Sequence, residues 1–249
     1  MRRFAAGRAD NGACGRDRLP DAPAWYGLAL PLYLFAFLAL DTRGVGLQLA
    51  IAAVTWVVLL AACVPLVVEQ RLRVALVVLV ATVGEVTGSL IWGVYTYRLD
   101  NLPAYIPPGH GLVYLGGLGL SVALARHGRV IVVGAAVAAL VWGIAGLGLL
   151  PRLDVAGALG IPLLLFCLWR ARNRTVYAGV FIVVMALEVY GTWLGVWTWR
   201  PELPGLGIPQ GNPPSGVASG YVFFDVFAVF VAARLMRWNP LRRLGVAQA

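Results

Sequence analysis

Three carboxyl side chains, Glu85, Glu188 and Asp225, interrupt long apolar stretches of the sequence. Glu85 stands about 12 residues into its stretch, which at a rise of 1.5 Å per helical residue is roughly 18 Å, near the centre of a bilayer. Glu188 and Asp225 are expected at similar depths. An ionisable side chain at that depth rarely faces lipid, so each of the three is a candidate functional residue.

The chemistry expected of these acids is proton donation. No arginine or histidine is expected at their depth, and burial without a cation favours the neutral carboxylic acid. We therefore predict that at least one of the three is protonated near neutral pH and serves as a general acid. Glu85 or Glu188 is the predicted acid, with Asp225 as its partner or as a base that positions water. The alternative is that the acids hydrogen-bond neighbouring helices and hold a bundle together.

Both glutamates stand at the head of a repeated block. "EVTG" (85–88) and "GVYTYR" (93–98) return as "EVYG" (188–191) and "GVWTWR" (195–200), and "IPPGH" (106–110) returns as "IPQGN" (208–212). The first copy has one extra residue between Gly88 and Gly93, which a helix commonly absorbs as a π-bulge. The copies are separated by an even number of predicted spans, which predicts two parallel four-helix repeats. Repeats of this kind place shared sites at their interface, but whether the two copies form one site or two is left open.

The side chains that follow the glutamates are predicted to bind substrate. Aromatic faces stabilise cations, although tyrosine and tryptophan also form belts at membrane interfaces. The deeper rings either line a cavity or simply pack between helices, namely Trp92, Tyr190 and Trp193. The rings nearer the interface, more typical of a belt, are Tyr97, Trp197 and Trp199.

The polar members of the blocks are expected at the membrane surface. An arginine ends each block, where it either holds a carbonyl, carboxylate or phosphate group or simply lies at the interface. His110 and Asn212 take matching positions in loops, as polar contacts. The complete predicted substrate-binding set is Trp92, Tyr95, Tyr97, Tyr190, Trp193, Trp197, Trp199, Arg98, Arg200, His110 and Asn212.

These residues need helices to position them, and the composition predicts an all-α integral membrane protein. Of 249 residues, 60% are hydrophobic and 12% are charged, against about 25% charged in soluble domains. About eight transmembrane helices are expected, with seven as the alternative because the fourth and sixth are short. The candidate spans are 23–41, 46–68, 73–96, 110–126, 129–150, 153–170, 174–198 and 214–236.

The expected organisation is two repeats between two tails. The first repeat is 23–127 and the second is 128–236. A polar, disordered tail is expected at 1–22 and a basic tail at 237–249. The linkers "LPAYIPPGHG" and "LPGLGIPQGNPPSG" are too rich in proline and glycine to be helical throughout. They are expected to fold over the outer mouth of the bundle or to dip into it.

The basic residues predict the orientation of the chain. All 20 are arginines, and 16 of them fall in the tails or in loops of one side. This pattern places both termini in the cytoplasm, as expected for a multi-pass protein of the inner (plasma) membrane. Membrane lipids are therefore the expected partners of the basic residues and nucleic acid is not; the oligomeric state is left open.

Cofactors and metals are not expected. The three cysteines, Cys14, Cys63 and Cys167, have no spacing typical of a zinc site or a disulfide framework. The sequence has no nucleotide-binding fingerprint, P-loop, nucleophile elbow or HExxH motif, which disfavours kinases, ATPases and zinc proteases.

The repeated block resembles the membrane proteins of carotenoid biosynthesis, including carotenoid hydratases. The matching residues are Glu85, Gly88, Gly93, Tyr95, Tyr97, Leu102, Pro103, Ile106 and Pro107, with a second partial match from Glu188 to Pro209. The resemblance implies a polyene or isoprenoid substrate and a reaction begun by protonating an alkene, which is hydration (a lyase) or cyclisation (an isomerase).

Two other classes of function fit the same residues. Carboxyl groups at mid-depth between repeats also serve proton-coupled transporters. A non-catalytic membrane subunit could use the acids only to join helices. The enzyme is expected to bind a hydrophobic small molecule and to lose turnover, rather than stability, when the acids are replaced.

Overall fold

The computed structural model describes residues 22–41 and 44–238, apart from some side chains of the last helix, including that of Asp225. Nearly all of the predicted disordered tail (1–22) and of the basic tail (237–249) therefore lies outside the described residues. The elements are α1 (Tyr26–Asp41), α2 (Val45–Cys63), α3 (Val68–Glu85), the π-helix η1 (Val86–Ile91), β1 (Tyr95–Tyr97), α4 (Ile106–Ala123), the 3₁₀-helix η2 (Ala125–His127), α5 (Gly128–Gly146), α6 (Val155–Arg170), α7 (Arg174–Trp193), β2 (Trp197–Trp199) and α8 (Val217–Trp238).

The all-α prediction is confirmed, and each predicted span overlaps an α-helix, although α3 begins at Val68 rather than at 73 and the predicted spans 73–96 and 174–198 end in the strands β1 and β2. Four helical segments are long and apolar enough to cross a membrane, namely Val45–Cys63, Val68–Ile91, Ala125–Gly146 and Arg174–Trp193. The start predicted for the fourth span was too late. α4 begins at Ile106, because Pro107 and Pro108 occupy its first turn, where a helix does not use the missing N–H groups.

The predicted π-bulge is confirmed. The extra residue of the first copy is absorbed in η1, which continues α3 directly beyond Glu85. Gly93 and Gly195 then turn the chain with φ of +71° and +70°, a conformation that favours glycine. Both copies therefore leave their helix in the same way and pass into a short strand.

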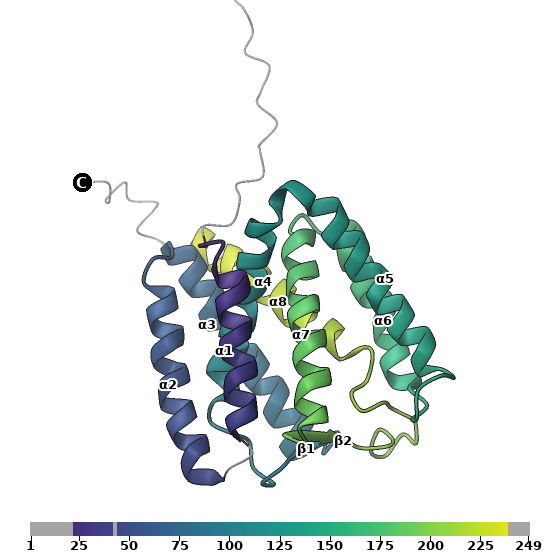
Figure 1. Ribbon diagram of the computed structural model, residues 1–249. Helices are drawn as coiled ribbons and strands as arrows, with labels where there is room; N and C mark the ends of the chain where they lie inside the picture. Colours follow the sequence, from purple (N-terminus) through teal and green to yellow (C-terminus); the bar gives the residue numbers. More distant parts are fainter. Residues whose placement is uncertain (1–21, 42–43, 239–249) are drawn as a thin grey trace, which may run out of the picture.

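α4 is the central helix and packs against α1, α3 and α7 (Figure 1). Its glycines allow backbones to touch. A Cβ on Gly117 would lie 2.6 Å from the backbone nitrogen of Val180 in α7, and a Cβ on Gly119 would lie 2.4 Å from that of Gly27 in α1. Small residues at helix contacts give close packing of this kind in membrane bundles.

Adding one methyl group at Gly117 should separate α4 from α7. We expect Gly117→Ala to lower the free energy of unfolding by roughly 1–3 kcal/mol, as overpacking in a core does. Gly134→Ala on α5 is the matched control, because its Cβ meets nothing within 4 Å. Thermal unfolding in detergent compares the two, and equal melting temperatures would show that the α4–α7 contact is not tight.

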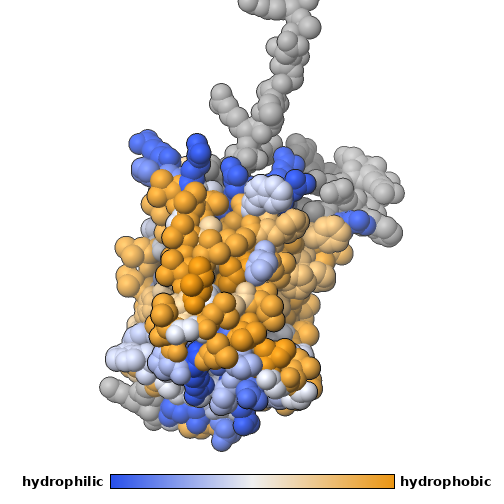
Figure 2. All heavy atoms as spheres, turned by 90° about the vertical axis from the view of Figure 1, so that its right-hand side faces the viewer, coloured by the Kyte–Doolittle hydropathy of each residue, from blue (hydrophilic) through white to orange (hydrophobic). Residues whose placement is uncertain are grey.

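The outer surface of α5 and α6 is strongly hydrophobic. Figure 2 shows a broad apolar face between two ends that carry hydrophilic residues. Exposed side chains on this face include Val133, Val137, Val141, Leu159 and Phe166. An apolar surface of this extent suits contact with lipid tails.

Candidate functional site

The two repeated aromatic blocks pair with each other. β1 and β2 form an antiparallel ribbon in which Tyr95 is opposite Trp199 and Tyr97 is opposite Trp197, with a pair of threonines between them. Alternate residues of a strand point to the same face, so all four rings lie on one side of the ribbon. The rings of Tyr95 and Trp199 are 4.5 Å apart at their centroids. The ribbon thus presents two tyrosines and two tryptophans to the helices above it.

The tyrosines of β1 bind Glu85 at the end of α3. Tyr95 and Tyr97 donate to Oε2 of Glu85 at 2.5 and 2.6 Å. Burial, together with the neighbouring Glu85 carboxyl group, raises the pKa of the Tyr97 phenol well above its usual range, so it remains a donor. The glutamate itself is only 7% exposed.

His110 completes the surroundings of Glu85. Its Nε2 lies 3.0 Å from Oε1 of Glu85, and the histidine side chain is 4% exposed. The expectation that no histidine reaches the acids was therefore wrong, as was the placement of His110 in a loop. The helix starts early enough for His110 to lie inside α4, one turn after its prolines, facing α3.

The tryptophans of β2 bind the second acid, Glu188 in α7. Trp197 and Trp199 donate their indole N–H groups to Oε2 of Glu188 at 2.9 and 3.3 Å. Among the described residues, the hydrogen bonds to this carboxyl group come from these two indoles. Glu188 is 4% exposed. The two glutamates therefore have matching places but different partners, since Glu85 bonds to a histidine whereas no basic side chain of the described residues bonds to Glu188.

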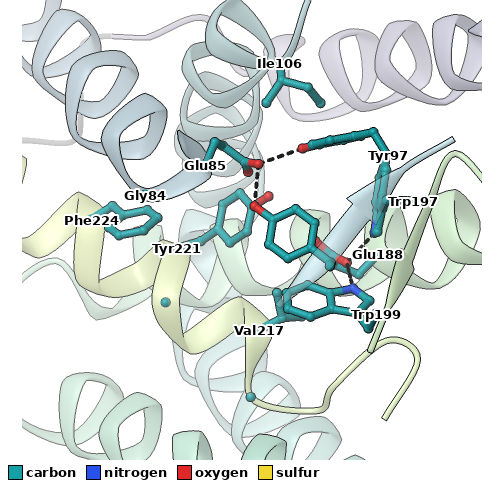
Figure 3. Close-up of a pocket in the computed structure, with 13 residues that line it drawn as sticks. Gly84, Glu85, Tyr97, Ile106, Glu188, Trp197, Trp199, Val217, Tyr221 and Phe224 are labelled. Carbon is teal, nitrogen blue, oxygen red and sulfur yellow. Dashed lines mark hydrogen bonds between the residues drawn. The ribbon is translucent and has the colours of Figure 1, made fainter. Parts of the chain in front are cut away.

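The two carboxyl groups meet at one cavity of about 270 Å³ (Figure 3). Its walls come from α3, both strands, the start of α4, α7 and α8. The lining residues are Gly84, Glu85, Tyr95, Tyr97, Ile106, Glu188, Trp197, Trp199, Gly216, Val217, Gly220, Tyr221 and Phe224. Most of the lining is aliphatic or aromatic, with the two acids as its most polar members. The site thus combines an apolar chamber with two carboxyl groups.

The glycines three residues after each glutamate make room for the rings. A Cβ on Gly191 would lie 2.1 Å from the ring of Trp197, and a Cβ on Gly88 would lie 3.2 Å from the ring of Tyr95. Each glycine therefore lets the aromatic side chain pass over its own helix to the carboxyl group. The repeated spacing from Glu to Gly serves the hydrogen bond to the acid.

The structure reverses the locations predicted for the two groups of aromatic residues. The predicted belt residues Tyr97, Trp197 and Trp199 reach the acids. The rings expected in the cavity do not. Trp92 is 45% exposed and donates to the carbonyl of Pro204, and Trp193 is 76% exposed. Tyr190 lies with Trp193 in an outer groove formed with Phe35 and Trp142. Their depth was judged from distance along the sequence, but the rotation of each helix turns these rings away from the site.

The arginines and the asparagine predicted to contact the substrate contact other parts of the protein instead. Arg98 donates to the backbone carbonyl of Asp41 and lies 3.6 Å from its carboxylate, so it ties β1 to the end of α1. Arg200 is exposed, and its backbone joins the ribbon. Asn212 lies in the loop before α8, where its Oδ1 accepts from the backbone of Trp199. None of the three lines the cavity.

Asp225 belongs to α8, but its side chain lies outside the described residues, so its predicted role stays a prediction. Another residue of α8, Tyr221, lines the cavity, and its ring lies 5.0 Å from that of His110. Sequence reasoning missed Tyr221. The available signal was its spacing of four residues from Asp225, a spacing typical of two residues that share one helix face.

Comparison with protein-family models, with curated proteins and with solved structures finds no match to this chain.

Proposed function

We propose that this protein is an integral membrane enzyme that protonates an alkene of a lipid-soluble substrate. The observation that supports it best is that two buried carboxyl groups, Glu85 and Glu188, face one apolar cavity. The resemblance to carotenoid-biosynthesis proteins points to an isoprenoid or polyene. The cavity of about 270 Å³ is slightly smaller than typical small-molecule sites of about 300–1,000 Å³. It suits the end of a long chain rather than the whole molecule.

The different partners of the two acids assign their roles. Within the described part of the chain, the Glu188 carboxyl group accepts from indole N–H groups alone, and burial without a cation favours the neutral acid. Glu188 is therefore the proton donor. Glu85 accepts from two tyrosines and lies against His110, which stabilises the carboxylate. Its negative charge then opposes the positive charge that develops on the substrate.

The rings of the ribbon provide the rest of the stabilisation. Tyr95 and Trp199 line the cavity from one side and Tyr221 from another. Aromatic faces attract cations within about 6 Å, and more strongly where water is excluded. A carbocation formed in the cavity would therefore be held between aromatic faces and the Glu85 carboxylate.

The reaction is balanced with the residues present. The Glu188 proton adds to one alkene carbon, the π electrons form the new C–H bond, and the other carbon becomes cationic. A water oxygen then forms a C–O bond and returns one proton to Glu188, which completes hydration. Alternatively, the π electrons of an internal alkene form a C–C bond to the cationic carbon, and the new cation then loses a proton from a neighbouring C–H bond to the Glu188 carboxylate, which completes cyclisation and restores the acid.

The proposed architecture is eight spans in two parallel repeats, with both termini cytoplasmic in the inner membrane. Three observations support it. β1 and β2 pair around their central threonines, as a two-fold axis requires. The same axis would relate α3 to α7 and α4 to α8. Accordingly, α3 packs against α8 in the way that α7 packs against α4. The end of the bundle opposite the ribbon carries most of the arginines of the described chain, in its connections and in the adjoining turns of the helices.

Filling the cavity tests the proposal. Gly220 of α8 lines the cavity, and a Cβ there meets nothing within 4 Å. We expect Gly220→Leu to occupy substrate space and to lower turnover of an isoprenoid polyene by about 10- to 100-fold, the loss that corresponds to roughly 1–3 kcal/mol of binding. The measurement is chromatography of polyenes after incubation with the protein in lipid vesicles.

Gly134→Leu on the outer side of α5 is the matched control, because that position is also open within 4 Å. It should leave turnover unchanged. Proton-dependent uptake of a polar solute, with no change in any polyene, would favour the transporter instead. Equal activity of both leucine variants would mean that this cavity does not hold the substrate.

A further inference from the structure

A second, smaller cavity adjoins the first. It has a volume of about 50 Å³ and lies among α1, α4 and α7. Four residues line both cavities and so form the partition between them, namely Ile106, Glu188, Trp197 and Tyr221. His110 lines only the smaller one. Glu188 therefore stands between an apolar chamber and a compartment that contains the histidine.

The size and lining of the smaller cavity suit water. A buried water needs about 10–15 Å³ of such space and two to four polar partners. Glu188, His110 and Tyr221 all carry polar groups in its wall. Nε2 of His110 is engaged by Glu85, and among the described residues no hydrogen bond is found for its Nδ1. The compartment has room for one or a few waters but not for an isoprenoid.

We propose that this compartment holds the water that becomes the nucleophile, so that the enzyme hydrates its alkene rather than cyclising it. This inference rests on the proposed function and selects between its two outcomes. Glu188 gives its proton to the substrate in the larger cavity. The water, held by His110 and Glu188 at the partition, forms the C–O bond. The proton that it then loses goes to the Glu188 carboxylate, which regenerates the acid.

His110 acts here as a positioning residue, because it holds the water and is in turn held by Glu85. The geometry also explains why Glu85 and Glu188 have different neighbours. Glu188, which loses and regains a proton in each cycle, borders the water. Glu85, which stays ionised, holds His110.

Filling the compartment tests the inference. Val113 is buried and lines only the smaller cavity. We expect Val113→Phe to displace the water and to lower the ratio of hydrated to cyclised or isomerised product by at least about tenfold, because the carbocation loses its nearest nucleophile. Products are separated by chromatography, and ¹⁸O-labelled solvent water identifies the hydrated one. Val77→Phe on α3, equally buried but in neither cavity, is the control.

An unchanged product ratio in a folded Val113→Phe protein would overturn the inference, even if overall turnover fell. Val113→Leu gives the same test with a smaller side chain if the phenylalanine variant does not fold. A loss of turnover shared with Val77→Phe, without a change in ratio, also counts against the inference.

A measurement independent of turnover is a high-resolution structure of the full chain in lipid. It should show water density within hydrogen-bond distance of His110 and Glu188, and Val113→Phe should remove it. A dry compartment in the parent would overturn the inference. A parent with ordered water there that leaves all polyenes unchanged would instead refute the proposed function.

Discussion

The Glu188→Gln protein is expected to convert its substrate about 100- to 10,000-fold more slowly than the parent, the range that a general acid contributes. Glutamine has the shape of glutamic acid but no acidic proton. Its amide oxygen can still accept from Trp197 and Trp199, which now bind Oε2 of the acid at 2.9 and 3.3 Å. The ribbon and the cavity should therefore keep their geometry while the proton is lost.

Turnover in lipid vesicles and the melting temperature in detergent must be measured together for this variant. The infrared spectrum supplies a direct check, because the carbonyl band of a protonated carboxyl group should vanish from the Glu188→Gln protein. Glu202→Gln, in an exposed position of the loop after β2, is the control and should behave like the parent.

Three results would contradict the assignment of Glu188. Turnover by Glu188→Gln equal to that of the parent would show that Glu188 is not the general acid. A large loss of thermal stability with turnover retained would show that it joins helices instead. If the carbonyl band of the protonated carboxyl group vanishes in Glu85→Gln rather than in Glu188→Gln, the roles of the two glutamates are the reverse of those assigned.

The largest effect on stability is expected at Asp154, a residue outside the cavity. Asp154 caps the start of α6 by accepting from the backbone of Gly157 at 3.0 Å. It also accepts from the backbone of Gly211 at 2.8 Å, and from both the backbone and the hydroxyl of Ser215 at 2.6 Å. Its side chain is fully buried. One carboxylate thus holds the chain that leads from β2 into α8.

Asp154→Ala should leave three buried backbone N–H groups without an acceptor. Each such group costs about 1–3 kcal/mol, so the free energy of unfolding should fall by roughly 3–9 kcal/mol. For a chain of this size, the melting temperature should fall on the order of 10 °C. Turnover should fall too, because Val217 and Tyr221 follow this loop directly and line the cavity.

Thermal unfolding in detergent measures this effect, with Glu202→Ala as the exposed control. Asp154→Asn should be intermediate, because its amide oxygen can still serve some of the donors. A melting temperature for Asp154→Ala within a degree or two of the parent would show that the loop is held mainly by other contacts.

Much of the fold could be predicted from the sequence because its signals are one-dimensional. An apolar run of sufficient length predicts a helix, and every predicted span overlaps one. The shift of one residue between the repeated blocks predicted the π-helix after Glu85. Proline and glycine marked the non-helical chain before α8. Proline was misleading before α4, since the first turn of a helix tolerates it.

The surroundings of the acids required the tertiary structure. The sequence indicated that Glu85 and Glu188 are buried, because apolar residues flank them, and it showed that their aromatic blocks correspond. It could not show that the blocks pair with each other, which moves Tyr97, Trp197 and Trp199 under the carboxyl groups. The pairing joins residues about a hundred positions apart, so no local pattern contains it.

What the sequence alone determined is the apolar helices, the burial of the two acids and the duplication of their aromatic partners. Only the tertiary structure decided which side chains meet. His110, Tyr221 and Asp154 gain their roles from the rotation of α4 and α8 and from the path of one loop. In a chain where nearly every helix is hydrophobic on all sides, periodicity does not show which face is inward. The contacts between helices set those faces, and the contacts depend on the whole chain.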